Sequence, residues 1–218
     1  MKYKLTEETI SFFGKILHRI ECVTEFAEIA VGDKGGFVES LINLSSCGDA
    51  WVYGNARVYG NAQVHDTARV GGKARVGGNA QVGGNARVCG NAQVGGNARV
   101  CGDALVYGKA RVYGKAQVCG KAQVYGKARV YGKAQVHDNA QVGGNARVCG
   151  KARVINITFL DHYQITITDN HILIGCEQHT ISEWENFDDQ TIFKMDSGAL
   201  EWWVKHKNFI FMAIEFRK

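Results

Sequence analysis

The chain has 218 residues, with 27 glycines, no proline and 45% hydrophobic residues. No apolar run approaches the roughly 20 residues that span a bilayer, so we expect no transmembrane helix and no membrane partner. Seven cysteines, an odd number without a secretory signal, predict reduced thiols and a cytoplasmic location.

The net charge of +5 is unevenly distributed along the chain. Residues 50–154 contain 16 basic and 3 acidic residues, a net charge of +13. Residues 1–49 have a net charge of −3 and residues 155–218 one of −5. A basic middle between acidic ends predicts an anionic partner, although basic residues also keep a repeat soluble.

Residues 1–49 predict a small N-terminal β cap. Their start, MKYKLTEETISFFGKILHRI, does not resemble a signal peptide, because two glutamates stand where basic residues belong. We expect a strand or hairpin over Ile16–Val23, a turn at GDKGGF (Gly32–Phe37) and a degenerate lead-in coil over Leu44–Asp49.

From Ala50 to Val154 an Ala-x-Val unit recurs every six residues, eighteen times without a gap. The unit reads Ala-(Arg/Gln)-Val-(Tyr/Gly/Cys)-Gly-(Asn/Lys). Alternation with period two places alanine and valine inside, with arginine and tyrosine outside. Gly-Asn and Gly-Lys predict corners, since glycine takes unusual backbone angles and asparagine tolerates the left-handed region. Such a unit cannot bury its apolar side alone, so turns must stack.

This pattern resembles the hexapeptide-repeat family of left-handed parallel β-helices. The segments VGGNAR (Val82–Arg87) and VYGKAR (Val124–Arg129) match the family signature, and the likeness covers about half of the chain. The resemblance implies three hexads in each triangular turn of 18 residues, and hence six coils. The expected fold is an all-β solenoid, a left-handed parallel β-helix over residues 50–154, with a cap at each end.

Residues 155–218 predict an α+β cap. The segment ITITDNHILIGC is typical of a β-hairpin that turns at Asp169 and Asn170. A helix is expected to begin in TISEWENF, where Thr180/Glu183 and Ser182/Glu185 are two candidate capping boxes. A second helix is expected from about Ser197, while residues 208–216 fit a helix or a strand. Caps cover strand edges, and these aromatic ones are expected to form a homo-oligomer, a dimer or a trimer.

Both ends of the chain are similar to a narrower group of hexapeptide-repeat proteins. The motifs are GDKGGFVES, NLSSCGDAWVYGNARV and ITITDNHILIGCEQHTISEWENFDD. The group is found in bacteriophages and prophages, and its members are labelled hypothetical or acyltransferase-like. The resemblance therefore implies a phage source and a host cytoplasm, and it supplies no shared catalytic activity.

Positions 18 residues apart should stack in columns along the coil. One column contains five of the nine arginines of the repeat, with three tyrosines two positions further along the same strands. Guanidinium groups beside aromatic rings suit an anionic, planar ligand, although both residue types also fill outward β positions by propensity. We call this column the arginine face; its candidate ligand-binding residues are Arg57, Arg75, Arg111, Arg129, Arg147, Tyr59, Tyr113 and Tyr131.

Two His-Asp pairs and three successive rungs with sulfur or imidazole side chains are further candidates for chemical sites. His65-Asp66 and His137-Asp138 lie four coils apart, and each aspartate should replace a turn glycine and point away from its histidine. Cys101, Cys119 and His137 occupy successive rungs, but a straight ladder does not converge on a zinc ion. We therefore expect no metal, no cofactor and no catalytic residue.

Three classes of function stay open. The preferred one is a non-catalytic solenoid whose arginine face binds nucleic acid, a nucleotide or an acidic host protein, and thereby interferes with host defence. The second, implied by the resemblance, is coenzyme A-dependent acyl transfer, whose enzymes have a catalytic histidine and an extended loop. Residues 50–154 have no such loop, and the candidate bases are His65, His137, His162, His171 and His179. The third is a structural assembly protein.

Overall fold

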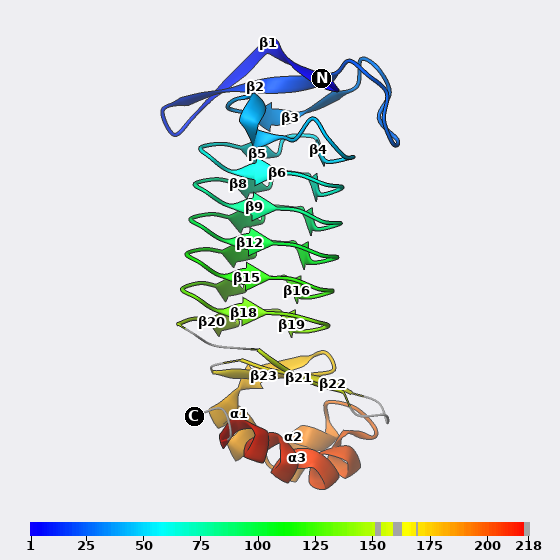
Figure 1. The fold of residues 1–218 in the computed structure, drawn as a ribbon. Helices are drawn as coiled ribbons and strands as arrows, with labels where there is room; N and C mark the ends of the chain where they lie inside the picture. Colours follow the sequence, from blue (N-terminus) through cyan, green and yellow to red (C-terminus); the bar gives the residue numbers. More distant parts are fainter. Residues whose placement is uncertain (151–153, 159–162, 169, 216–218) are drawn as a thin grey trace.

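The computed structural model describes residues 1–150, 154–158, 163–168 and 170–215. A long coil of short parallel strands ends in a β-rich cap on the N-terminal side and in a cap of strands and helices on the C-terminal side (Figure 1). The predicted solenoid with two caps is confirmed, and its left-handed winding stays a prediction. Within the described residues no helix is long and apolar enough to cross a membrane.

In the described residues, seventeen two-residue strands, one every six residues, form about six turns of the coil in three parallel ladders. The first ladder contains β5 (Arg57–Val58), β8 (Arg75–Val76), β11 (Gln93–Val94), β14 (Arg111–Val112), β17 (Arg129–Val130) and β20 (Arg147–Val148). The second contains β4 (Trp51–Val52), β7 (Arg69–Val70), β10 (Arg87–Val88), β13 (Leu105–Val106), β16 (Gln123–Val124) and β19 (Gln141–Val142). The third contains β6 (Gln63–Val64), β9 (Gln81–Val82), β12 (Arg99–Val100), β15 (Gln117–Val118) and β18 (Gln135–Val136).

Alanine and valine from consecutive turns fill the interior of the coil. Their side chains in residues 50–148 are at most 2% exposed, so the predicted inward face is confirmed. A core this narrow and close-packed leaves no room for larger side chains. Pairing in steps of eighteen, as between Arg111 and Arg129, confirms the predicted columns. The last hexad, with Arg153, lies outside the described residues.

Each corner of the coil turns at a residue with positive φ. Gly114 has a φ of 69°, and a Cβ atom added there would lie 2.9 Å from the carbonyl oxygen of Gly132. Glycine is therefore needed both for its backbone angle and for the close approach of the next turn. Asp66 and Asp138 stand at such corners with φ of 59° and 58°, which confirms the prediction that aspartate replaces a turn glycine there.

Asparagine has a different role at the corners from the one predicted. It follows the residue with positive φ and does not itself adopt the left-handed region. Asn61 Nδ2 donates to Asn79 Oδ1 at 3.1 Å, and Asn79 Nδ2 donates to Asn97 Oδ1 at 2.9 Å. The amides thus form a hydrogen-bonded column that joins successive turns.

The N-terminal cap is an antiparallel hairpin joined to the first ladder. It consists of β1 (Tyr3–Phe12) and β2 (Lys15–Cys22), and β2 also pairs with β3 (Lys34–Val38). The β3 strand in turn pairs in parallel with β5. A strand was predicted over Ile16–Val23, and β2 lies there, but its partner β1 begins well before that segment.

The predicted turn at GDKGGF is wrong for most of its length. The chain turns at Val31 and Gly32 and then continues as β3. A Cβ atom on Gly35 would lie 2.6 Å from the Val52 carbonyl oxygen, and one on Gly36 would lie 2.7 Å from that of Ala56. These two glycines allow a close approach between strands, which a sequence pattern does not distinguish from a turn.

The lead-in coil predicted over Leu44–Asp49 is confirmed, because Ser45 N donates to the Val64 carbonyl oxygen at 2.9 Å and Gly48 has a φ of 70°, like the corner glycines of the coil. After a 3-10 turn, η1 (Leu41–Asn43), the buried Leu44 forms a parallel bridge with Val64. The Lys2 ammonium group closes the end of this coil, because Nζ donates to the backbone carbonyl of Ala50 at 2.9 Å.

The C-terminal cap begins with an antiparallel sheet of four strands. They are β21 (Ile155–Thr158), β22 (Gln164–Ile167), β23 (His171–Ile174) and β24 (Glu177–Thr180), paired in that order. The predicted hairpin is confirmed as β22 and β23. Of its expected turn residues, Asn170 lies between the strands and Asp169 lies outside the described residues.

In the part of the chain that the structure describes, three helices follow the sheet: α1 (Ile181–Asn186), α2 (Asp189–Phe193) and α3 (Ala199–Glu215). The capping box of Thr180 and Glu183 begins α1, with Glu183 N donating to Thr180 Oγ1 at 3.1 Å. Ser182 lies inside α1, so the second candidate box does not begin the helix. Helix α3 starts two residues after Ser197, where a helix was expected. It continues to Glu215, so most of residues 208–216, which fitted a helix or a strand, are helical.

Candidate anion-binding face

The arginine face is one side of the coil and runs along the first ladder (Figure 1). Arg57 and Arg75 are half-buried there, while the three arginines nearer to the C-terminal cap are exposed: Arg111, Arg129 and Arg147. Tyr59 and Tyr113 are half-buried, and Tyr131 is exposed. The structure thus brings all the predicted residues into one column, but it does not bring them into one pocket.

A cavity of about 260 Å³ opens on the N-terminal half of the arginine face. Three consecutive turns contribute two residues each, one from a corner and one from the following strand. Three of the six side chains are cationic, three are amides and none is acidic. We call it the basic cavity; it is lined by Asn55, Arg57, Lys73, Arg75, Asn91 and Gln93.

The basic cavity offers hydrogen-bond donors without acidic partners. No ion pair between described residues includes Arg57, Lys73 or Arg75. Arg57 Nε is buried without a hydrogen-bond partner, which is uncommon for such a group. The Tyr113 hydroxyl donates to Gln93 Oε1 at 2.6 Å, which leaves the amide N–H groups of Gln93 as donors. Clustered charged donors suit the oxygens of a phosphate or carboxylate.

The tip of the N-terminal hairpin packs beside the basic cavity. The Phe12 ring centroid lies 4.6 Å from Arg57 Cζ and 5.1 Å from Arg75 Cζ, and 5.3 Å from the Tyr59 ring. These contacts hold both guanidinium groups against an aromatic ring. Phe12 was missed in the sequence, because the hexad pattern does not say which column the hairpin covers.

Two tyrosine rings of the arginine face lie over glycines. A Cβ atom added to Gly77 would come within 3.0 Å of the Tyr59 ring, and one added to Gly95 would lie 3.2 Å from Tyr113 Cδ1. Burial raises the pKa of Tyr113, so its hydroxyl is protonated at neutral pH and donates to Gln93. Each of these two rings therefore lies against the backbone of a neighbouring turn and does not project freely into solvent.

The prediction that the Asp66 side chain points away from His65 is wrong. His65 Nδ1 lies 2.9 Å from Asp66 Oδ2, because the positive φ of Asp66 breaks the strand alternation on which the expectation rested. Gly84 N also donates to Asp66 Oδ2, at 2.8 Å. This backbone donor and His65 lower the pKa of Asp66. His137 lies four rungs away in the same ladder, as expected.

Cys101 and Cys119 form a disulfide across adjacent turns, with Cα atoms 4.7 Å apart. The prediction of seven reduced thiols is wrong at these positions, since neighbouring rungs of a ladder have the spacing that a disulfide needs. Neither sulfur is then available as a thiolate ligand beside His137. Within the described residues, no group of three or more His, Cys, Asp or Glu side chains is arranged to hold a metal ion.

The candidate bases for acyl transfer are spread over the coil and the C-terminal cap. His171 lies 2.8 Å, Nδ1 to Oδ1, from Asn170, and burial lowers the pKa of His171. His179 Nε2 lies 3.3 Å from Glu177 Oε2. His162 lies outside the described residues. The strands from β4 to β20 keep their six-residue spacing, so no extended loop interrupts the coil between them.

A family model described as YdcK Beta solenoid repeat matches six segments of the coil. The repeat is that of a β-solenoid. The matched segments are residues 50–66, 80–96, 92–108, 98–114, 122–138 and 140–156. No curated protein matches the chain. The comparison thus agrees with the fold of the solenoid.

Proposed function

We propose that this β-solenoid is a binding protein that holds a phosphate-bearing ligand on its arginine face. The basic cavity carries the proposal: Arg57, Lys73 and Arg75 lie together without a carboxylate, and Arg57 Nε is buried without a partner. A phosphate group would supply acceptors for the terminal N–H groups of the two arginines, and bidentate contacts with arginine are among the strongest hydrogen bonds available.

The rest of the arginine face extends the positive charge along the coil. Arg111, Arg129 and Arg147 continue the column at exposed positions, and Lys109 and Lys127 stand at the adjoining corners. A ligand with several phosphates would follow this column, whereas a nucleotide would occupy the basic cavity alone. The likeness of both chain ends to phage proteins leads us to expect a ligand from a bacterial host.

The test is a titration at low salt with a labelled single-stranded oligonucleotide and, separately, with a nucleoside triphosphate. Arg57→Gln with Arg75→Gln should weaken the binding of both about tenfold or more. Glutamine is a suitable replacement, because Gln93 occupies the same column. Arg111→Gln with Arg129→Gln should weaken only the oligonucleotide.

The matched control is Arg87→Gln with Arg99→Gln, which removes the same charge from the other two ladders. It should change both affinities less than about twofold, because distant exposed charges are screened. Equal losses in the control and in the Arg57/Arg75 variant would mean that net charge alone attracts the ligand. That result, or no binding of either probe, would overturn the proposal.

A further inference from the structure

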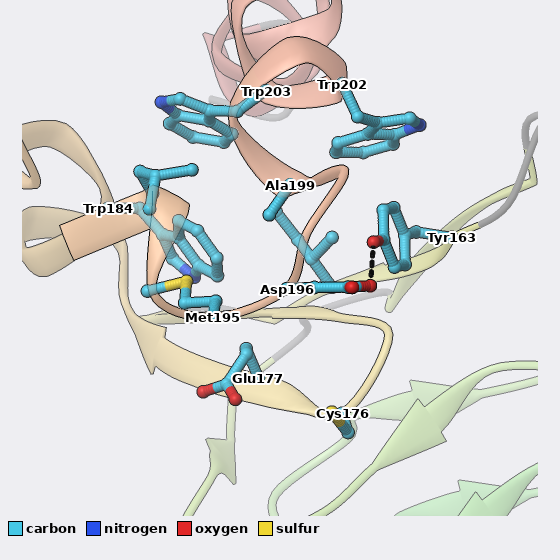
Figure 2. Close-up of a pocket in the computed structure, with 11 residues that line it drawn as sticks. Tyr163, Cys176, Glu177, Trp184, Met195, Asp196, Ala199, Trp202 and Trp203 are labelled. Atoms are coloured by element: carbon cyan, nitrogen blue, oxygen red, sulfur yellow. Dashed lines mark hydrogen bonds between the residues drawn. The ribbon is translucent and has the colours of Figure 1, made fainter. Parts of the chain in front are cut away.

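The C-terminal cap encloses a second cavity, of about 210 Å³, between its sheet and its helices (Figure 2). Two aromatic pairs form opposite walls. The ring centroids of Trp184 and Trp203 are 5.0 Å apart, and those of Tyr163 and Trp202 are 5.1 Å apart. Ala199 lies between the two pairs and leaves the space open. We call this cavity the aromatic pocket.

The rings of the aromatic pocket are held in place by contacts outside it. Trp184 Nε1 donates to the Ile172 carbonyl at 2.9 Å, which fixes the indole against β23. Gly175 has a φ of 57° in the turn after β23, and a Cβ atom there would lie 3.0 Å from Tyr163 Cδ1. The three tryptophans that line the pocket are at most 8% exposed. The ring faces are therefore positioned before a ligand arrives, which lowers the entropic cost of binding.

Of the described side chains that line the aromatic pocket, two are charged and both are acidic. Asp196 accepts a hydrogen bond from the Tyr163 hydroxyl (Figure 2), and this bond lowers the pKa of the Asp196 carboxyl. Glu177 lies on β24, with its carboxylate 3.3 Å from His179 Nε2. Among the residues that the structure describes, no lysine, arginine or histidine lines the pocket. The interior thus combines aromatic faces with negative charge.

We propose that the aromatic pocket binds a small organic cation of the alkylammonium type, such as a trimethylammonium group. Indole faces attract a cation that keeps few water molecules, and carboxylates add long-range attraction. An anion would be repelled by Asp196 and Glu177. A neutral apolar ligand would fill the space without using either carboxylate. This site lies in the opposite cap from the hairpin beside the basic cavity, and it does not depend on the function proposed there.

The experiment compares choline with 3,3-dimethylbutan-1-ol, which has nearly the same shape and no charge. Each is titrated into the full chain, with tryptophan fluorescence or heat as the signal. We expect choline to bind about tenfold tighter than the alcohol. Equal affinities would identify a pocket for neutral apolar ligands and would overturn the proposal, as would no detectable binding of choline. This comparison uses the unaltered protein, so it does not depend on the folding of a variant.

Variants then test the role of the two carboxylates. Asp196→Asn with Glu177→Gln should weaken choline binding about tenfold and leave the affinity for the alcohol unchanged. The matched control is Glu201→Gln, an exposed carboxylate in the first turn of α3 that does not line the pocket. It should leave choline binding unchanged. A loss in the control as large as in the double variant would overturn the assignment to the pocket.

Discussion

A large ring one turn away accounts for several of the outward glycines in this solenoid. Gly77 faces the Tyr59 ring, Gly83 faces the His65 ring and Gly143 faces the Tyr125 ring, each so closely that an added Cβ atom would come within 3.0 Å. The alternation of tyrosine and glycine along a column is thus partly a packing relation between neighbouring turns.

We predict that Gly77→Ala costs about 1 kcal/mol of folding free energy, because the new methyl group displaces the Tyr59 ring. The same substitution in a Tyr59→Ala background should cost almost nothing. Gly71→Ala is the matched control at the same hexad position, since its Cβ atom would lie at an ordinary 3.6 Å from Tyr53 Cβ. Urea unfolding measures all four variants. Equal costs for Gly77→Ala in both backgrounds would contradict the packing relation.

At this scale the sequence predicts which side chains face outward, but not which way they lean. Period-two alternation places Tyr59 and His65 outside the coil, and both lie there. Their lean over a glycine depends on side-chain torsions that the pattern does not contain. The contact between His65 and Asp66 was mispredicted for a related reason, because a corner residue with positive φ does not follow the strand alternation.

A charged contact joins the N-terminal hairpin to the coil. Lys15 Nζ on β2 lies 2.6 Å from Glu39 Oε1, and the backbone N–H of Gly60 donates to Glu39 Oε2 at 2.7 Å. Lys15 first, and Gly60 second, lower the pKa of Glu39 from its ordinary 4.5. A carboxyl whose pKa is lowered on folding stabilises the protein above its unfolded pKa. The stabilisation disappears as the pH falls through the folded pKa.

We therefore predict that Glu39→Gln lowers the free energy of unfolding by about 1 kcal/mol near pH 7, and that the difference is smaller at about pH 3, below the ordinary pKa of the carboxyl. Urea unfolding of both proteins at the two pH values measures it. Glu7→Gln, which alters an exposed carboxylate on β1, should show little difference at either pH. A cost for Glu39→Gln that is the same at both pH values would show that the charge is not what matters.

The caps were less predictable than the coil, because each is a single, aperiodic arrangement. The hexad recurs eighteen times, so the same pattern indicates the pairing of every turn. No pattern in the sequence indicates that Phe12 lies beside Arg57 and Arg75. The hairpin of β22 and β23 and the capping box at Thr180 carry local signals and were found. No local sequence signal predicts the aromatic pocket, since Tyr163 and Trp202 meet only when the cap folds.

For the molecule as a whole, the charge partition seen in the sequence corresponds to the architecture. The positive charge lies on the coil and the negative charge on the caps, so a polyanion should be directed to the solenoid faces. A homo-oligomer formed through the caps stays a prediction. The two proposed sites use opposite charges in different parts of the molecule, so an anion and a cation would not compete.

The most direct test of the central claim is the salt dependence of oligonucleotide binding to the unaltered protein and to the Arg57→Gln/Arg75→Gln variant. If Arg57, Lys73 and Arg75 bind phosphates, the logarithm of the association constant should fall against the logarithm of salt with a slope of about −2 or steeper. The variant should show a shallower slope and weaker binding. A slope near zero, or the same slope and affinity in both proteins, would contradict an anion site on the arginine face.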